Sequence, residues 1–180
     1  MVIVFLGDSI TAGFMELAKH GVINLGIPGD RTIDVIERLP GVVSYQPDRL
    51  FLMIGINDIL TNHGIGFTDK PIATEATYEF IVRYLVNHLQ TKDIYLLSVL
   101  PVRSIHIFQP DDEKKLNEAI DRLNDHIERL ARQYGIHYLH IIDDFKDPYG
   151  RLKSTWTTDG IHLSKEGYSC LYEKLKYLLR

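Results

Sequence analysis

Residues 2–13 contain the stretch that decides the fold. They read Val2-Ile3-Val4-Phe5-Leu6-Gly7-Asp8-Ser9-Ile10-Thr11-Ala12-Gly13. The run before Gly7 is wholly apolar, which is typical of a strand buried on both faces of a parallel sheet. Gly7 and Asp8 interrupt this run, so we expect the chain to turn sharply from a strand toward a helix at Ser9. That position lies at the carboxyl edge of the sheet, where it exposes the Ser9 hydroxyl to a ligand.

Apolar periodicity along the rest of the chain predicts an α/β domain. Four further runs read as buried strands: Val22 to Leu25, Arg49 to Ile54, Ile94 to Val99 and Ile136 to Ile142. Three sets of apolar residues recur at helical spacing: Tyr78, Ile81, Val82, Leu85 and Leu89; Leu116, Ala119, Ile120, Leu123, Ile127, Leu130 and Tyr134; and Tyr168, Leu171, Tyr172, Leu175 and Leu179. Alternating strands and helices predict a parallel sheet with helices on both faces. We therefore expect one three-layer α/β/α domain over residues 1–180.

Composition excludes several classes of protein. Hydrophobic residues make up 45% of the 180 residues and charged residues 24%, as in ordinary globular proteins. The chain has 20 Lys and Arg against 24 Asp and Glu, a net charge of −4 with dispersed basic residues, which disfavours a nucleic-acid partner. Cys170 is the one cysteine, so no intramolecular disulfide can form. The first apolar run is too short for a signal peptide, and we expect a cytoplasmic protein without stable membrane insertion.

Two glycine- and asparagine-containing segments follow the second and third predicted strands. They are Asn24-Leu25-Gly26-Ile27-Pro28-Gly29-Asp30 and Gly55-Ile56-Asn57-Asp58. A glycine N–H and an Asn amide at such places can donate hydrogen bonds to an oxyanion. Each segment alone is equally consistent with a tight turn, or with Asp58 capping the next helix. Asp8-Ser9 is likewise a common helix N-cap. The oxyanion-donor interpretation of these segments is favoured because the ends of parallel strands are expected to meet near Ser9.

Asp159-Gly160-Ile161-His162 supplies a carboxylate and an imidazole three residues apart. The two side chains can meet across a turn, so that Asp159 holds the Nδ1–H of His162 and leaves Nε2 free to take a proton from Ser9. The ordinary histidine pKa, near ~6.5, suits that task at neutral pH. Seven other histidines compete for this role. His137 and His140 are predicted to point to opposite faces of the last strand, which makes them a poor metal pair.

Two irregular segments, 61–73 and 101–112, are candidate substrate-facing loops. They contain His63 and His106, which either contact a ligand or face water. Trp156 either lines an acyl pocket or packs against the final helix.

Taken together, these segments resemble the GDSL, or SGNH, hydrolase superfamily. Gly7-Asp8-Ser9-Ile10 is similar to its first block, with Ile10 in place of leucine, and the segments ending at Asp30, Asp58 and His162 are similar to its second, third and fifth blocks. The resemblance implies a flavodoxin-like five-stranded parallel sheet with strand order 2-1-3-4-5. It also implies site roles: Ser9 as nucleophile, His162 as base, Asp159 as the residue orienting it, and Ser9, Gly29 and Asn57 as oxyanion donors. The family's glycine is the one just before the aspartate, which selects Gly29 over Gly26.

The activity implied by the resemblance is hydrolysis of carboxylic esters by two-step acyl transfer through Ser9, without a cofactor or metal ion. The scarcity of inserted sequence favours short acyl or acetyl esters. An acetylated sugar, a lysophospholipid or platelet-activating-factor-like lipid, a thioester and a simple ester all remain open as small-molecule substrates, as does the oligomeric state. An alternative is a phosphate- or nucleotide-binding flavodoxin-like domain, with Ser9, Thr11 and Gly13 around an anion. That alternative explains neither Asn57 nor the Asp159–His162 pair. A catalytically inactive interaction domain is disfavoured because every chemical role is filled.

Overall fold

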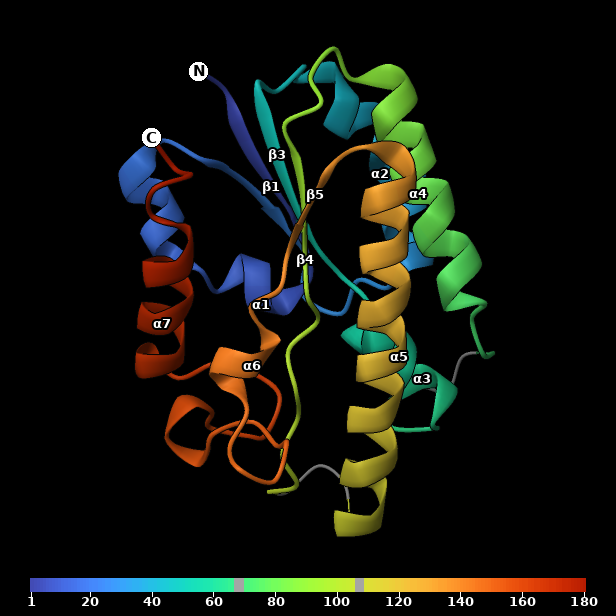
Figure 1. Ribbon diagram of the computed structural model, residues 1–180, viewed down its shortest axis with the longest axis vertical. Coiled ribbons are helices and arrows are strands. Elements are labelled where there is room, and N and C mark those ends of the chain that lie inside the picture. Colours follow the sequence, from blue (N-terminus) through green and yellow to red (C-terminus); the bar gives the residue numbers. More distant parts are fainter. Residues whose placement is uncertain (67–69, 106–108) are drawn as a thin grey trace.

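The computed structural model describes residues 1–66, 70–105 and 109–180, and its centre is a five-stranded parallel sheet. The strands are β1 (Ile3–Gly7), β2 (Ile23–Gly26), β3 (Arg49–Met53), β4 (Ile94–Leu97) and β5 (His137–Leu139). Their order is β2-β1-β3-β4-β5, and every neighbouring pair is parallel. Helices cover both faces of the sheet (Figure 1). The predicted α/β/α fold and the strand order implied by the family resemblance are both confirmed.

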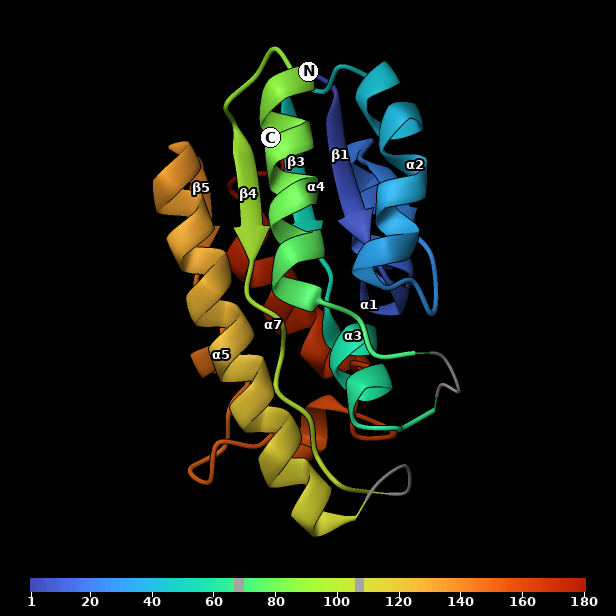
Figure 2. The ribbon, with the colours of Figure 1, turned by 90° about the vertical axis from the view of Figure 1, so that its right-hand side faces the viewer.

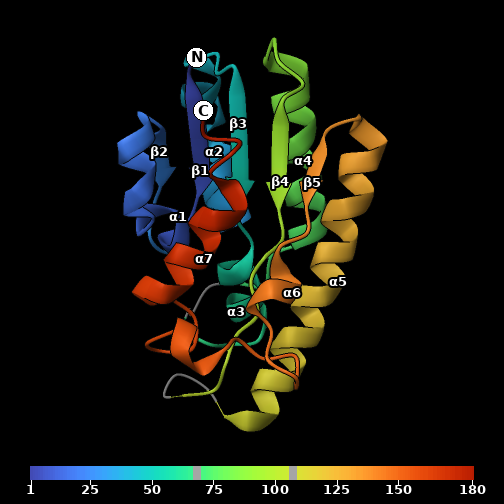
Figure 3. The same ribbon diagram turned by 60° about the vertical axis from the view of Figure 1, so that its left-hand side comes forward.

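Helices on the two faces enclose the sheet. Figure 2 shows α2 (Thr32–Ser44), α4 (Thr74–His88) and α5 (Pro110–Tyr134) over one face. Figure 3 shows α7 (Lys165–Leu175) over the other. Short helices follow the strands at the carboxyl edge and near the C-terminal turn: α1 (Ser9–Ala12), η1 (Met15–His20), α3 (Ile56–Asn62), α6 (Ile142–Phe145) and η2 (Ser154–Trp156). Among the described residues no helix combines the length and apolarity needed to cross a membrane.

The helix α2 was not predicted from apolar spacing. Its interior contains Pro40 and Gly41, which are poor helix formers. Val35, Leu39 and Val42 are nevertheless buried against the sheet. Burial of this face outweighs the unfavourable propensity, as is usual for helices in a folded protein.

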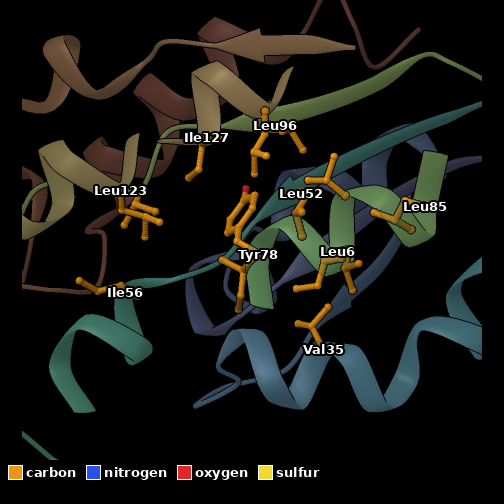
Figure 4. Close-up of a cluster of buried hydrophobic side chains, with 14 of the residues drawn as sticks. Leu6, Val35, Leu52, Ile56, Tyr78, Leu85, Leu96, Leu123 and Ile127 are labelled. Atoms are coloured by element: carbon orange, nitrogen blue, oxygen red, sulfur yellow. The ribbon is translucent and has the colours of Figure 1, made fainter. Parts of the chain in front are cut away.

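Strand side chains alternate between two apolar layers. In the layer under α2, α4 and α5, Leu6, Leu52 and Leu96 of the sheet meet Val35 and Leu85 of the helices (Figure 4). This alternation places consecutive residues of one strand on opposite faces. A strand buried on both faces must therefore be apolar, as β1 and β4 are throughout and as β3 is after Arg49.

The other face carries a ladder of aromatic rings across four strands. Phe5, Phe51, Tyr95 and His137 are direct neighbours in the strand register. Their ring centroids lie 5.2, 5.0 and 4.5 Å apart in that order, with nearly parallel planes. Such offset stacks add to the free energy gained from burial. His137 thus has a packing role at the end of the sheet.

Two expectations about the strands are wrong. The last strand ends at Leu139, because the Ser98 hydroxyl accepts hydrogen bonds from the N–H groups of Ile141 and Ile142, at 2.8 and 3.1 Å. These N–H groups are thereby drawn away from the sheet, and Ile142 begins α6. The edge strand β2 is also not buried on both faces, since its residues are half-buried or exposed.

Asp8 connects β1 to α1 and caps the helix. Its carboxylate accepts a hydrogen bond from the N–H of Ile10 at 3.0 Å, and only 2% of its surface is exposed. Burial raises the pKa of Asp8 to about 7, with smaller upward contributions from Asp58 and Asp30; the Ile10 N–H and His162 oppose the shift. The charge of this carboxyl group therefore changes near neutral pH.

We predict that Tyr78→Phe will leave the free energy of unfolding unchanged or raise it by about 1 kcal/mol. The Tyr78 hydroxyl is fully buried and has no hydrogen-bond partner among the described residues. Figure 4 shows the ring among Leu52, Leu96 and Ile127. Urea denaturation measures the effect. The matched control is Tyr168→Phe, which should lose about 1 kcal/mol because its hydroxyl donates to the Ile10 carbonyl at 3.0 Å. Equal losses in the two variants would contradict the prediction.

A second prediction concerns Asp8→Asn. The pKa of Asp8 is higher in the folded protein than its ordinary value of 3.8. Its contribution to stability is therefore fully present below pH 4 and is lost as the pH rises through 7. Asparagine also caps helices but does not ionise. The stability of Asp8→Asn relative to the unsubstituted protein should thus improve between pH 5 and pH 8, by on the order of 1–3 kcal/mol. Urea denaturation across this range measures the difference, and a pH-independent difference would refute the assignment.

Candidate functional site

Ser9, His162 and Asp159 form a continuous hydrogen-bonded chain at the carboxyl edge of the sheet. The Oγ atom of Ser9, at the start of α1, lies 3.0 Å from Nε2 of His162. The Nδ1 atom of His162 lies 2.5 Å from Oδ2 of Asp159. Ser9 and His162 are 153 positions apart in the sequence, and the fold brings them into contact. The predicted association of these three side chains is therefore present in the structure.

Hydrogen bonds within the 157–163 turn orient Asp159 and His162. The Oδ1 atom of Asp159 accepts the backbone N–H groups of Ile161 and His162, at 2.9 and 2.8 Å. Partial burial by itself raises the pKa of Asp159, but these N–H groups and the His162 ring outweigh it and lower the pKa. Asp159 is thus held as a carboxylate facing the imidazole.

A neighbouring loop supports this turn from behind. The N–H of Arg103 donates to the Gly160 carbonyl at 2.9 Å. Gly160 has φ +98°, and a Cβ atom there would lie 1.9 Å from the Arg103 carbonyl oxygen. Glycine is therefore required between Asp159 and His162 for the turn to approach the 101–105 segment. Part of the predicted 101–112 loop thus supports the site directly.

Gly29 lines the same cavity as Ser9. It has φ +87°, and a Cβ atom there would meet nothing within 4 Å. Gly26 is different, because a Cβ atom there would lie 2.2 Å from the backbone nitrogen of Ala12. Gly26 serves the close approach of β2 to α1, whereas Gly29 lines the same cavity as Ser9. The structure therefore places Gly29, and not Gly26, at the cavity.

Asn57 occupies the first turn of α3 and is 7% exposed. Its Nδ2 atom donates to the carbonyl oxygen of Asp30 at 2.8 Å. An amide nitrogen carries two hydrogens, so a second N–H is available to a ligand. The bond to Asp30 also ties α3 to the segment that carries Gly29.

These residues surround a cavity of about 430 Å³. It is lined by Ser9, Pro28, Gly29, Asn57, Leu60, Ile65, Gly66, Ile161 and His162. Among the described residues no Asp, Glu, Lys or Arg lines this cavity, and no group of three or more His, Cys, Asp or Glu is arranged to hold a metal ion. One cavity is thus lined by a hydroxyl paired with a histidine and by two residues that carry N–H groups, Gly29 and Asn57.

Ile65 and Gly66 are the contribution of the predicted 61–73 loop to this cavity. Thr61 belongs to α3 rather than to a loop. His63 lines a different cavity behind α3, and its Nδ1 atom lies 2.8 Å from the Ile59 carbonyl oxygen. His106 lies outside the described residues.

The remaining candidates lie away from Ser9. Trp156 packs edge-on against Phe145, with ring centroids 5.3 Å apart, in the apolar layer beneath α7. The packing alternative for Trp156 is thus the one observed. His140 lies 2.9 Å from a carboxylate oxygen of Asp143. It shares no ligand cluster with His137, whose ring stacks on Tyr95.

Asp58 has a structural role that its local sequence does not predict. Its carboxylate is fully buried and accepts hydrogen bonds from both the N–H, at 2.9 Å, and the hydroxyl of Thr32 at the start of α2. Burial raises the pKa of Asp58 to about 6, against the lowering effect of the Thr32 hydrogen bonds. Asp58 therefore anchors α2, whereas the alternative that it caps the following helix does not hold, because Asp58 lies inside α3. A charged residue next to an apolar run was the one available signal.

Known structures share this fold. A Streptococcus pneumonia protein named for platelet activating factor is 31% identical, with a TM-score of 0.81 over 99% of this chain and 83% of that one. A GDSL-like lipase from Bacteroides thetaiotaomicron is 24% identical, with a TM-score of 0.81 over 98% of this chain and 86% of that one. An acetylxylan esterase from Geobacillus stearothermophilus is 18% identical, with a TM-score of 0.79 over 98% of this chain and 93% of that one.

Sequence comparison adds one curated relative and a family. The N-acylneuraminate cytidylyltransferase of Escherichia coli is 27% identical over 162 residues, which is 88% of this chain. The chain spans about a third, 35%, of the length of that relative. The model of the GDSL-like lipase/acylhydrolase family matches residues 5–170, which is most of the chain. The chain therefore belongs to the GDSL-like lipase/acylhydrolase family, a family of carboxylic ester hydrolases.

Proposed function

We propose that this chain is a serine esterase that cleaves carboxylic esters by two-step acyl transfer. The observation that carries the proposal is the continuous Ser9–His162–Asp159 hydrogen-bonded chain. In the first step the Ser9 Oγ atom bonds to the ester carbonyl carbon while its proton passes to Nε2 of His162. His162 then returns this proton to the departing alcohol. The Asp159 carboxylate stabilises the imidazolium that forms between these events.

The second step releases the acid. Water gives a proton to Nε2 of His162 as its oxygen attacks the acyl carbon. The proton returns to Ser9 Oγ when the bond between Ser9 and the acyl group breaks. In both steps the carbonyl oxygen becomes negative and accepts hydrogen bonds from the N–H groups of Ser9 and Gly29 and from Nδ2 of Asn57. Support for these roles comes from the cavity that the three residues share.

The substrate we propose is a neutral ester with a short acyl group, such as acetyl. Pro28, Leu60, Ile65 and Ile161 give the cavity an apolar wall. An apolar wall without charged side chains favours an uncharged acyl group over an acidic one. The similar Geobacillus protein is an acetylxylan esterase, solved as a catalytic mutant in which a serine is changed to alanine. Both features support an acetyl ester and a serine nucleophile here.

The phosphate-binding alternative is not favoured. An anion at the start of α1 would meet the Asp8 carboxylate, which already accepts the N–H of Ile10. The hydroxyl of Thr11 is buried and is not directed to the cavity that Ser9 lines. Ser9 itself is bonded to His162. A phosphate there would be repelled by the ionised form of Asp8 and would displace the hydrogen bond between Ser9 and His162.

We predict that Ser9→Ala will abolish turnover of para-nitrophenyl acetate while the melting temperature stays within a few degrees. The hydroxyl is the attacking group, and its removal leaves no buried cavity. A fluorophosphonate should label Ser9 in the folded protein and leave Ser9→Ala unlabelled, as located by peptide mass spectrometry. Retained turnover in Ser9→Ala, or labelling at a different residue, would show that the proposed mechanism is incorrect.

A further prediction concerns Asn57→Ala, which should lower kcat by roughly 100- to 1,000-fold with a smaller change in KM. Asn57→Asp should be at least as damaging, since it places a negative charge beside the developing oxyanion. Steady-state kinetics with the same acetate ester measure both effects. Asn62→Ala is the matched control: it removes an amide of the same helix that bonds to Ile72 and lines a different cavity. Near-normal kcat in both Asn57 variants would leave Asn57 with a turn role only.

A further inference from the structure

Arg38 of α2 reaches three segments at the carboxyl edge of the sheet. Its Nη2 atom donates to the Gly7 carbonyl at 3.0 Å, and Nη1 donates to the Leu25 carbonyl at 2.8 Å. Nε and Nη2 lie 2.8 and 2.6 Å from one carboxylate oxygen of Asp30. The side chains of Arg38 and Asp30 are only 22% and 12% exposed. One guanidinium therefore joins the end of β1, the end of β2 and the segment that follows β2.

These three acceptors bracket the site proposed above. Gly7 precedes Ser9 by two residues, and Asp30 directly follows Gly29. The distance between the Ser9 hydroxyl and the Gly29 N–H therefore depends on how the 27–30 segment is attached to β1. Arg38 provides that attachment through its side chain.

The 27–30 segment has few other contacts. Ile27, Pro28 and Gly29 are exposed, and a Cβ atom at Gly29 would meet no neighbour within 4 Å. At one end of the segment the Ile27 N–H donates to the Gly7 carbonyl at 3.1 Å, and at the other end the Asn57 amide donates to the Asp30 carbonyl at 2.8 Å. The Arg38 ion pair holds the side chain of Asp30, whereas Asn57 binds its backbone carbonyl. Without the ion pair, the hydrogen bond from Asn57 of α3 would be the remaining side-chain contact at this end of the segment among the described residues.

The same ion pair controls a charge near the cavity. Burial raises the pKa of Asp30, and Arg38 opposes that shift. The guanidinium therefore favours the ionised form of Asp30 and balances its negative charge. An uncompensated carboxylate next to Gly29 would repel the negative oxygen that forms during acyl transfer. Loss of Arg38 therefore affects both the position of the 27–30 segment and the balance of charge at Asp30.

We propose that Arg38 is a positioning residue for ester hydrolysis, holding the Gly29 N–H at its working distance from Ser9. Its planar guanidinium carries five donors in a fixed arrangement, which suits three acceptors at once. A lysine ammonium has the same charge but is a single point and cannot reproduce this geometry. The inference rests on the proposed Ser9 mechanism, because it assigns Arg38 a role only through the Gly29 donor.

The expected effect of an Arg38 variant on kcat follows from how far an oxyanion donor can move before it stops working. Donors must stay within about 0.5 Å of their working position to be effective. Complete loss of one oxyanion donor costs about 100- to 1,000-fold in kcat. A displaced donor should cost less than a missing one. Arg38→Gln should therefore lower kcat by roughly 10- to 100-fold and change KM by less than about 3-fold.

The control is Arg49→Gln, at the amino end of β3. Arg49 is 18% exposed, donates to Asp93 at 2.7 Å and to the Leu178 carbonyl at 2.6 Å, and so resembles Arg38 in burial and partners. It lies at the opposite edge of the sheet from Ser9. Both variants should lower the melting temperature to a similar extent, and only Arg38→Gln should lower kcat.

The test is steady-state kinetics on para-nitrophenyl acetate at a temperature well below melting, together with thermal denaturation of each variant. Arg38→Lys keeps the charge and should keep most of the stability while recovering only part of kcat. Should Arg38→Gln fail to fold, Arg38→Lys alone decides: a fall of kcat by more than about 5-fold at a near-normal melting temperature supports the role. An unchanged kcat in the folded Arg38 variant, or an equal fall in Arg49→Gln, overturns it. Retained turnover in Ser9→Ala would instead refute the mechanism itself, so the two failures are distinguishable.

Discussion

Parallel pairing of β1 with both β2 and β3 is the constraint on which the rest of the structure depends. In this register Gly7 of β1 stands beside Gly26 of β2 and Met53 of β3. The three strands therefore end at the same level of the sheet, and the segments that follow them carry Ser9, Gly29 and Asn57. A shift of one residue in either pairing would reverse the faces of every side chain in the strand. The same register that buries the apolar core thus also brings the site residues together.

Irregular backbone at this edge requires hydrogen bonds from outside the sheet, and buried polar side chains supply them. Asp58 binds the start of α2, Arg38 binds the ends of β1 and β2, and Asn124 of α5 pairs with both backbone groups of Val99 after β4. None of these three side chains lines the cavity that contains Ser9. The site is therefore built on supports that cannot move independently of the core. The pKa values of the carboxyl groups in this region also differ. Burial raises the pKa of Asp58 to about 6, whereas hydrogen bonds lower the pKa of Asp159.

Much of this protein was determined by local sequence. Runs of apolar residues indicated all five strands. For the central strands β1, β3 and β4 the reason is that a strand covered by helices on both faces has no polar side. Spacing of three to four residues indicated α4, α5 and α7, because one helical face must be buried. The short motifs around Ser9, Asn57 and His162 indicated the site through their resemblance to a known family, since each motif alone also fits a turn or a helix cap.

Only the tertiary structure decided the features that depend on contacts between distant segments. The end of β5 depends on the Ser98 hydroxyl of a neighbouring strand, and the formation of α2 across Pro40 depends on burial against the sheet. The distinction between Gly26 and Gly29 depends on which glycine meets the backbone of α1. The role of Arg38 was invisible because its acceptors lie 8, 13 and 31 positions away. Local periodicity records which side of an element is buried, whereas the identity of the group that it meets there is set by packing between elements.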